Sequence, residues 1–348
     1  MTSSRYRGSL AVWALLLAYA SLYPFVPLRL PSSLDAVAGF FSRPRYVTDF
    51  DVAVNILAYI PLGTLTCLYF RQPGGGARAI FKAAAFGAAF SFVMETCQLF
   101  IPGRIASIYD TLANAGGALL GALAFADPFY SLVTRPLGEM RERLLIAGVW
   151  GDAGLVLVML WLIAQLNPAL PFFGAGNIPG DAAAVMQLEI LQWAAVAMSI
   201  WGFGLFISSL LEGEKGALRV TLVLLSVALW LKFTAASVML QPHFAEEWVS
   251  TGRAIGLAVG IVFLVPTRRF PRSGRIYLAL VLVLAGALCS KIVGAYSPLE
   301  DFLRLFRWPY GQLASFATLT RFLHEVWPLM ALVFLMALFL RVRRDAMR

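Results

Sequence analysis

The chain has 348 residues, of which 60% are hydrophobic and only 14% are charged, and its mean hydropathy is +0.77. A soluble domain of this composition could not cover its own surface with polar groups, which excludes an ordinary soluble protein. The net charge of +9 comes from arginines and lysines gathered in short loops between apolar stretches, so it indicates membrane topology and not a nucleic-acid partner. The three cysteines and two histidines show no metal-ligand spacing, and we expect no cofactor.

Apolar stretches long enough to cross a bilayer recur along the chain. In lipid such spans must be helices, because no water satisfies their backbone groups. We therefore predict an all-α fold, a polytopic integral membrane helical bundle of about ten transmembrane helices. The expected span cores are residues 9–28, 52–70, 80–100, 109–126, 145–166, 185–211, 218–240, 250–266, 276–296 and 324–341.

Basic residues precede the first span, fill every second connection after it and close the chain. Because cytoplasmic loops carry the excess of lysine and arginine, this pattern places both termini in the cytoplasm. The first span also has a competing interpretation as a signal peptide, since Ala18-Tyr19-Ala20 resembles a cleavage site after an apolar core. The apolar stretch continues past that site to Val26, which favours a retained span.

A polar segment over residues 128–144 separates two groups of spans. It contains Pro128, Pro136 and Gly138 and falls in a basic, cytoplasmic connection. We predict a four-span unit, a cytoplasmic linker and a six-span unit. These parts are residues 1–127, 128–144 and 145–348.

The pattern Asp-(x3)-Asn occurs twice, at Asp51 and Asn55 and again at Asp110 and Asn114. In a helix, positions i and i+4 share a face, so each copy places a carboxylate and an amide on one stripe. An Asp costs about 2.5–3.5 kcal/mol at mid-bilayer and less near the interface, which favours a function for both copies at the outer ends of their spans. The alternative is that both Asp residues are helix caps, although capping does not require an Asn one turn deeper.

The third expected span reaches the same side with Glu95 and Gln98 on one face. Pro102 and Gly103 then break the helix, and Arg104 follows within the turn. The connection is short and apolar, so we predict an elbow in the outer interface. There Arg104 could neutralise Glu95 or Asp110, or bind an anionic group through its planar guanidinium.

Three ordered motifs in this region resemble a known family. They are Asp51-(x3)-Asn55-(x5)-Pro61-Leu62-Gly63, Glu95-(x2)-Gln98-(x2)-Ile101-Pro102-Gly103-Arg104, and Ser107-(x2)-Asp110-(x3)-Asn114-(x)-Gly116-Gly117-(x3)-Gly121. Over roughly residues 45–127 the chain is similar to the VanZ-like membrane proteins. The resemblance implies a bacterial envelope protein of the cytoplasmic (inner) membrane and, through the name-giving member, a link to teicoplanin resistance. It supplies no reaction, and the six C-terminal spans lie outside it.

Two further features of these motifs concern packing. Pro61 lies in mid-span, where it should kink the helix and free a carbonyl near residue 57. Gly117-(x3)-Gly121 is a small-xxx-small pattern, which permits close approach of a second helix.

The C-terminal unit has a secondary cluster of intramembrane polar residues, which are Glu189, Gln192, Lys232 and Lys291. A buried lysine needs a partner, so we expect Glu189 to pair with Lys232 or Lys291. The alternative is that both lysines extend to the outer interface. His243 and His324, which we expect in loops beside glutamates, are interpreted as structural.

These observations favour a non-enzymatic envelope protein that binds or moves an anionic amphiphile, either a phospholipid or a cell-wall lipid intermediate. Membrane lipids are the expected partners, and the sequence does not predict an oligomeric state. The expected ligand-binding residues are Asp51, Asn55, Glu95, Gln98, Arg104, Asp110 and Asn114.

Two alternatives remain open. The first is a membrane-embedded hydrolase or transferase with Glu95 as general base and Asp110 as its partner, because clustered carboxylates can form an acid/base pair. The second is a proton-coupled transporter with Glu95 or Glu189 as the proton site.

Overall fold

The computed structural model describes residues 6–23, 25, 27–30, 34–42, 49–71, 76–102, 104–126, 129–170, 172–173, 189–213, 216–240, 251–293 and 312–347. Across these ranges the regular structure is helical, and strand pairing is limited to one isolated antiparallel bridge between Leu145 and Leu211. The prediction of an all-α chain is therefore confirmed for the described residues.

Six of the described helices are long and apolar enough to cross a membrane. They are Asp51–Phe70, Gly76–Gln98, Gln192–Leu210, Ala217–Met239, Arg272–Ile292 and Phe316–Ala346. Three shorter helices, Arg7–Leu22, Val149–Gln165 and Thr251–Thr267, are also apolar. The helical membrane class follows from these lengths and compositions, whereas the count of ten spans and the cytoplasmic position of both termini stay predictions.

The chain divides into two compact units, Met1–Arg141 and Glu142–Arg348. The division falls within the segment 128–144 that the sequence marks as a linker. Its described part is helical, with a π-helical turn η2 (Tyr130–Thr134) followed by α6 (Arg135–Leu144). The side chains of α6 are largely exposed.

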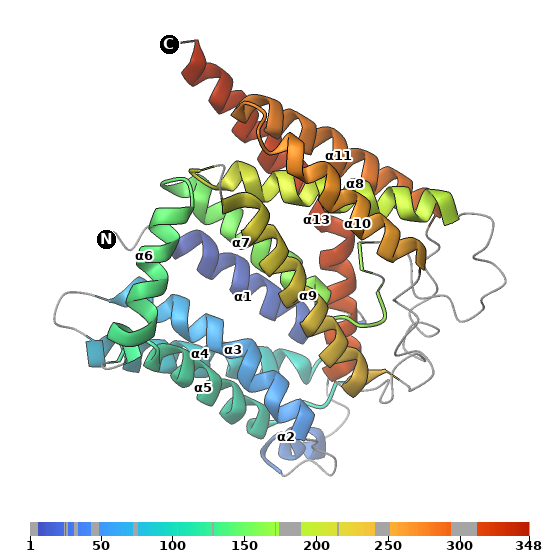
Figure 1. Cartoon of the computed structure of the whole chain (residues 1–348). Helices are drawn as coiled ribbons and strands as arrows, with labels where there is room; N and C mark the ends of the chain where they lie inside the picture. Colours follow the sequence, from blue (N-terminus) through green and yellow to red (C-terminus); the bar gives the residue numbers. More distant parts are fainter. Residues whose placement is uncertain are drawn as a thin grey trace. The chain divides into compact units, whose positions relative to one another are not determined.

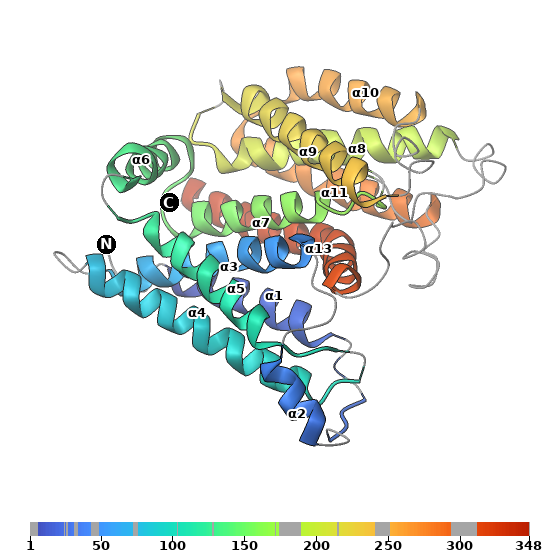
Figure 2. The same cartoon turned by 90° about the horizontal axis from the view of Figure 1, so that it is seen from below.

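The N-terminal unit is built on three long helices that pack side by side (Figure 1, Figure 2). Besides α6, its α-helices are α1 (Arg7–Leu22), α2 (Leu34–Phe41), α3 (Asp49–Phe70), α4 (Gly76–Gln98) and α5 (Ile108–Leu123). Helix α3 packs most extensively on α5, α4 packs on both, and α1 covers α3 and α4. Leu17 of α1 enters a core with Tyr59, Leu62 and Ala118.

Glycines allow α3 and α5 to touch backbone to backbone, as the Gly117-(x3)-Gly121 pattern predicts. A Cβ atom on Gly117 would collide with the backbone of Ile56, and one on Gly121 with the backbone of Ile60. A Cβ on Gly63 of α3 would in turn collide with the backbone of Ala118. Since lipid provides no hydrophobic drive for helix association, such close packing is a main source of helix–helix stability in a membrane.

Pro61 lies inside α3, and a nearby carbonyl finds a partner on another helix. The indole Nε1 of Trp13 in α1 donates a hydrogen bond of 3.0 Å to the carbonyl oxygen of Ala58. A proline leaves carbonyls of the preceding turn without their usual helical donors. The carbonyl that Pro61 frees is expected at residue 57, and the bond from Trp13 lies one residue further along, where it holds α1 against α3.

The C-terminal unit is organised around one helix that is buried on most of its surface. Its helices are α7 (Val149–Gln165), α8 (Glu189–Leu210), α9 (Ala217–Met239), α10 (Thr251–Thr267), α11 (Arg272–Val293) and α13 (Gln312–Ala346). In α8 the most apolar window is 72% buried, against 22–33% in the other long helices, and α8 packs on α10, α11 and α9. A helix that is apolar all round is expected in such a central position.

Two helix ends differ from the expected spans. Helix α1 ends at Leu22 and not at 28, because Tyr23 is extended (φ −60°, ψ 134°), as the residue before a proline tends to be. Helix α13 begins at Gln312, well before the expected start at 324, and continues through Pro328. His324 and Glu325 therefore lie within a helix, which corrects their expected position in a loop.

Candidate functional site

The polar residues predicted in the N-terminal unit meet where α4 ends and α5 begins. Glu95 and Gln98 occupy the last turn of α4, Arg104 lies in the connecting loop, and the two Asp-(x3)-Asn patterns open α3 and α5. We call this set the polar cluster. It consists of Asp51, Asn55, Glu95, Gln98, Arg104, Asp110 and Asn114.

Arg104 anchors the end of α1, a contact that the sequence did not predict. Its Nη2 donates hydrogen bonds of 2.6 Å and 2.9 Å to the carbonyl oxygens of Ala20 and Ser21. The Nε2 atom of Gln98 donates to the same Ser21 carbonyl at 3.1 Å. The last carbonyls of a helix lack intrahelical donors and carry partial negative charge, so a guanidinium there is favourable.

Burial lowers the pKa of the Arg104 guanidinium from its usual value, and attraction to the Glu95 carboxylate opposes that change. Arginine remains protonated throughout. Arg104 therefore brings a permanent positive charge into the polar cluster, and its neutralisation of Glu95 stays a prediction.

Glu95 is 3% exposed and holds the start of α5. Its Oε2 accepts a hydrogen bond of 2.9 Å from the backbone N–H of Ser107, which is the N-cap of α5. The Ser107 hydroxyl in turn accepts from the backbone N–H of Tyr109 at 3.1 Å. A carboxylate beside a helix N-terminus meets unpaired N–H groups and the positive end of the helix dipole, which offsets part of the cost of its burial.

The two Asp-(x3)-Asn patterns are linked by a hydrogen bond across α3 and α5. Nδ2 of Asn55 donates to Oδ1 of Asp110 at 2.9 Å. Because Ser107 is the N-cap of α5, Asp110 lies in the first turn and is not the cap, so the capping interpretation is wrong for this copy. Asp51 also lies close enough to Asp110 for the two carboxylates to repel each other.

Several buried polar atoms at this site find no hydrogen-bond partner among the residues that the structure describes. They are Nε of Arg104, Oδ1 of Asn114 and Oγ1 of Thr111. Buried polar atoms in native proteins are nearly always satisfied by protein, water or ligand. Three unsatisfied atoms on residues of this region therefore require a polar partner, either water or a ligand.

Sequence reasoning missed Ser91, Tyr59 and Thr111. The hydroxyl of Ser91 accepts a hydrogen bond of 2.8 Å from Nδ2 of Asn114. Ser91 and Tyr59 each lie four residues from a predicted site residue, Glu95 and Asn55 respectively, and so share its helix face. Extending the polar stripes by one turn would have found both.

The lysine of α9 bonds a backbone carbonyl of the C-terminal unit. Lys232 is fully buried, and its Nζ donates a hydrogen bond of 2.8 Å to the backbone carbonyl of Asn167. Complete burial excludes the alternative in which Lys232 extends to the interface. The Asn167 side chain donates to Thr320 Oγ1 at 2.9 Å, so this network joins α9 to α13. The side chain of Glu189 lies outside the described residues, and so does His243.

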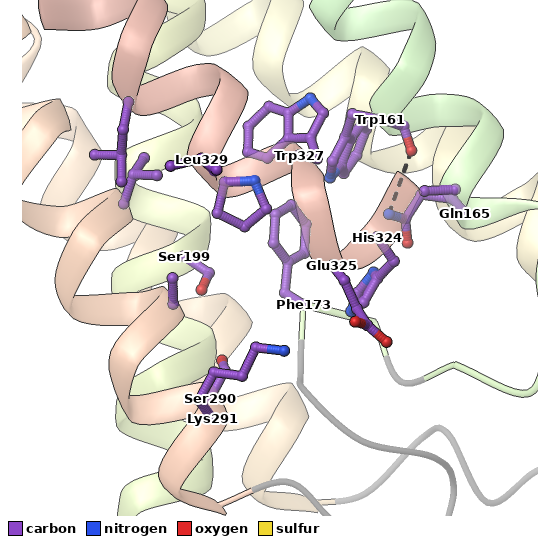
Figure 3. A pocket seen from close by; sticks show the side chains of 15 residues that line it. Trp161, Gln165, Phe173, Ser199, Ser290, Lys291, His324, Glu325, Trp327 and Leu329 are labelled. Atoms are coloured by element: carbon purple, nitrogen blue, oxygen red, sulfur yellow. Dashed lines mark hydrogen bonds between the residues drawn. The ribbon is translucent and has the colours of Figure 1, made fainter. Parts of the chain in front are cut away.

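Lys291 of α11 borders a cavity of about 220 Å³ within the C-terminal unit (Figure 3). We call it the C-terminal cavity. Gln192, the remaining member of the secondary cluster, is half-buried near the start of α8 and does not line it. The polar lining residues are Gln165, Ser199, Ser290, Lys291, His324 and Glu325.

Comparison with known proteins finds a family similarity in the first part of the chain. Residues 6–131 match the sequence model of the VanZ/LLP1 family. No curated protein and no solved structure matches the chain. The match includes every residue of the polar cluster, and it begins earlier than the expected residue 45, so α1 belongs to the VanZ-like unit.

Proposed function

Because residues 6–131 are VanZ-like, we propose that this unit binds the phosphate-bearing head group of an amphiphile at the outer leaflet of the bacterial cytoplasmic membrane. The candidates are a phospholipid and a polyprenyl-linked cell-wall intermediate. The observation that supports the proposal most is the set of unsatisfied buried atoms on Arg104, Asn114 and Thr111. A head group with several polar atoms would satisfy such a set.

Arg104 is the residue best suited to a phosphate oxygen. Two hydrogen bonds to α1 fix its guanidinium, while its buried Nε has no partner among the described residues. A donor that is already held in place loses little conformational freedom when the ligand binds. Arginine also binds phosphate oxygens through charge-assisted hydrogen bonds.

The other charges of the polar cluster restrict the head group further. Among the described residues, the polar cluster combines three carboxylates, on Asp51, Glu95 and Asp110, with one guanidinium, on Arg104. A bare anion would be repelled by this surplus of negative charge. The cluster therefore suits a head group that joins a phosphate to hydrogen-bond donors, such as an ammonium group or the hydroxyls of a sugar. In this arrangement Asp51 and Asp110 accept from the donors.

Native mass spectrometry of the full-length protein would test the proposal with matched lipids. Phosphatidylethanolamine carries a phosphate and N–H donors, whereas phosphatidylcholine carries the phosphate without those donors. We expect phosphatidylethanolamine, or a polyprenyl diphosphate that bears a sugar, to bind at least tenfold more tightly than phosphatidylcholine, about 1.4 kcal/mol. Equal affinities for all three lipids would contradict the proposal.

Three variants assign the roles of the residues. Arg104→Gln should weaken the binding of every phosphate-bearing lipid, and Asp51→Asn should remove the preference for a donor-bearing head. Arg78→Gln, an exposed arginine of α4 outside the polar cluster, serves as the control and should bind as the natural chain does. A teicoplanin susceptibility phenotype that follows Arg104→Gln would connect the bound lipid to the resistance for which the family is named.

A hydrolase or transferase is the second candidate, because Glu95 and Asp110 interact electrostatically at one site. In that case Glu95→Gln would abolish turnover of a lipid substrate while leaving its binding intact. Turnover that persists in Glu95→Gln would refute this candidate and leave the binding proposal standing.

A further inference from the structure

The segment between the last expected span of the N-terminal unit and α7 carries a row of exposed apolar side chains. In α6 the residues Leu137, Met140 and Leu144 follow the spacing i, i+3, i+7, so they share one face of the helix. Val133 in η2 precedes Leu137 by four residues, about one turn. All four side chains are exposed in the described structure. We call this row the apolar stripe.

The charged residues of α6 are arranged around the apolar stripe. By the helical period, Arg141 and Arg143 border the stripe on opposite sides, whereas Glu142 falls on the far face. Glu139 also lies off the stripe, and its carboxylate pairs with Nε of Arg135 at 2.9 Å. This order is typical of a helix at a lipid surface, where flanking arginines reach phosphate groups and the apolar face reaches the acyl chains.

The start of α6 is held beside the ends of two helices of the N-terminal unit. Oγ1 of Thr134, the last residue of η2, donates a hydrogen bond of 2.6 Å to the carbonyl oxygen of Ala124, the C-cap of α5. The guanidinium of Arg71, the residue after the end of α3, lies 4.0 Å from the ring centre of Tyr130. Helix α6 therefore begins where α3, which is long enough to cross a membrane, ends.

The end of α6 is held in a similar way within the C-terminal unit. The carbonyl oxygen of Leu144 accepts from the backbone N–H of Glu212 at 3.1 Å, and the N–H of Ile146 donates to the carbonyl oxygen of Leu210 at 2.8 Å. Leu210 is the last residue of α8, a second helix of membrane-spanning length. The expected topology places the ends of α3 and α8 on the cytoplasmic side. A helix of 10 residues bonded at both ends in this way is expected to run along the membrane surface.

The apolar stripe continues a series of apolar side chains that begins on α5. The exposed members of this series before the stripe are Leu119, Leu120, Leu123, Phe129 and Leu132. Exposed apolar side chains of a membrane helix face lipid, and an extended apolar surface marks an interaction site. Residues 127–128 and 214–215, which lie outside the described ranges, are Asp-Pro and Glu-Lys and add no large apolar side chain to this part of the chain. Lipid is therefore the occupant that best fits the stripe.

We propose that α6 lies in the plane of the cytoplasmic leaflet, with the apolar stripe among the acyl chains and Arg143 beside the head-group phosphates. An in-plane helix buries its apolar face about 5–10 Å into the boundary between head groups and acyl chains. The segment is then a membrane-surface element and not a solvated linker. This inference concerns the leaflet opposite to the one expected for the polar cluster, and it does not depend on lipid binding there.

Spin labels on the full-length protein test this placement in nanodiscs of phosphatidylethanolamine and phosphatidylglycerol. Cys97 and Cys289 are first replaced by serine, whereas the buried Cys67 is retained. Single cysteines for labelling are then introduced in the variants Leu137→Cys, Met140→Cys and Glu139→Cys. Power saturation measures the accessibility of each label to O2, which concentrates in the bilayer, and to a water-soluble nickel chelate.

Two further positions calibrate the measurement. Leu120→Cys labels an exposed apolar position of α5, and Arg344→Cys labels an exposed position in the last turn of α13. The ratio of O2 to nickel accessibility at Leu137 and Met140 should approach that at Leu120, and it should exceed the ratio at Glu139 about tenfold. The ratio at Glu139 should approach that at Arg344.

A substitution within the stripe should change the position of α6. Leu137→Glu places a carboxylate among the acyl chains and should lower the ratio at Met140 about fivefold, because the helix moves toward water. Glu142→Gln changes a polar residue of the far face and should leave that ratio unchanged. The ratio at Leu120 should stay constant in both variants, which shows that the unit remains folded in the bilayer.

Two results would overturn the proposal. High nickel accessibility at Leu137 and Met140 would place α6 in water. Low accessibility of the same two positions to both reagents would show that protein covers the stripe, and dilution with unlabelled protein would identify a second copy as that cover. Neither result would alter the lipid affinities measured at the polar cluster, so the two proposals fail independently.

Discussion

Asn55 in α3 donates a hydrogen bond of 2.9 Å to the carboxylate of Asp110 in α5. The bond joins the Asn of one Asp-(x3)-Asn pattern to the Asp of the other. Each pattern on its own places a carboxylate and an amide on one helix face. The structure shows that the amide of the first copy serves the carboxylate of the second, so the repeat forms one unit across two helices.

Removing this bond should destabilise the N-terminal unit. Asn55→Ala leaves the partly buried Asp110 carboxylate without its donor, which should cost about 1–3 kcal/mol of unfolding free energy. Asp51→Asn removes a neighbouring negative charge and should leave stability unchanged or raise it. Thermal unfolding in detergent measures both, and an unchanged transition for Asn55→Ala would show that the bond contributes little.

The contact between α3 and α5 should tolerate no side chain at its glycines. Gly121→Ala places a methyl group against the backbone of Ile60, which cannot move aside as a side chain can, and should cost about 1–3 kcal/mol. Gly116→Ala in the same helix meets no atom within 4 Å and should stabilise α5 by about 0.5–1 kcal/mol. Equal melting temperatures of these two variants would contradict the close packing.

Arg104 should hold the end of α1 in place whether or not a lipid is bound. In Arg104→Gln the carbonyls of Ala20 and Ser21 lose their guanidinium donor. Hydrogen–deuterium exchange should therefore rise over the last turn of α1 and not at the start of that helix. Glu95→Gln, which retains an acceptor for the Ser107 N–H, should leave exchange in α1 unchanged. A rise along the whole helix would instead indicate general unfolding.

Asn167 should matter more for stability than its loop position suggests. Its side chain donates to Thr320 Oγ1 and accepts from the backbone N–H of Ala169, and its carbonyl receives the buried Lys232. Asn167→Ala should lower the unfolding free energy by about 2 kcal/mol, because buried groups lose their partners. Ser237→Ala is the control, because the exposed hydroxyl that it removes bonds only within its own helix. Chemical denaturation compares the two.

Much of the fold could be predicted because membrane spans obey a simple rule. Long apolar stretches must be helical in lipid, so each expected span core overlaps a described helix. The first and last residues of the helices could be predicted less well, as the early start of α13 at Gln312 shows. The polar residues His324 and Glu325 predicted a loop. The structure shows that α13 continues through both and that they line a cavity.

The candidate site could be predicted in part. Motif spacing predicted that the polar residues at the ends of α3, α4 and α5 lie together, because helical periodicity determines which residues share a face. It could not show that Arg104 would cap α1, since that contact spans more than 80 residues of sequence. Nor could it find Gln165, because only the structure shows that its Oε1 atom has no hydrogen-bond partner among the described residues.

The glycine contacts of α3 and α5 also determine how the N-terminal unit can move. With backbone against backbone at Gly63, Gly117 and Gly121, these two helices cannot rotate or slide past each other without collision. They behave as a rigid pair. Helix α1 is held at its C-terminal end by the side chains of Arg104 and Gln98, which can release it without such a collision. For the lipid binding proposed above, we expect the rate of lipid exchange to depend on how often those side-chain bonds open.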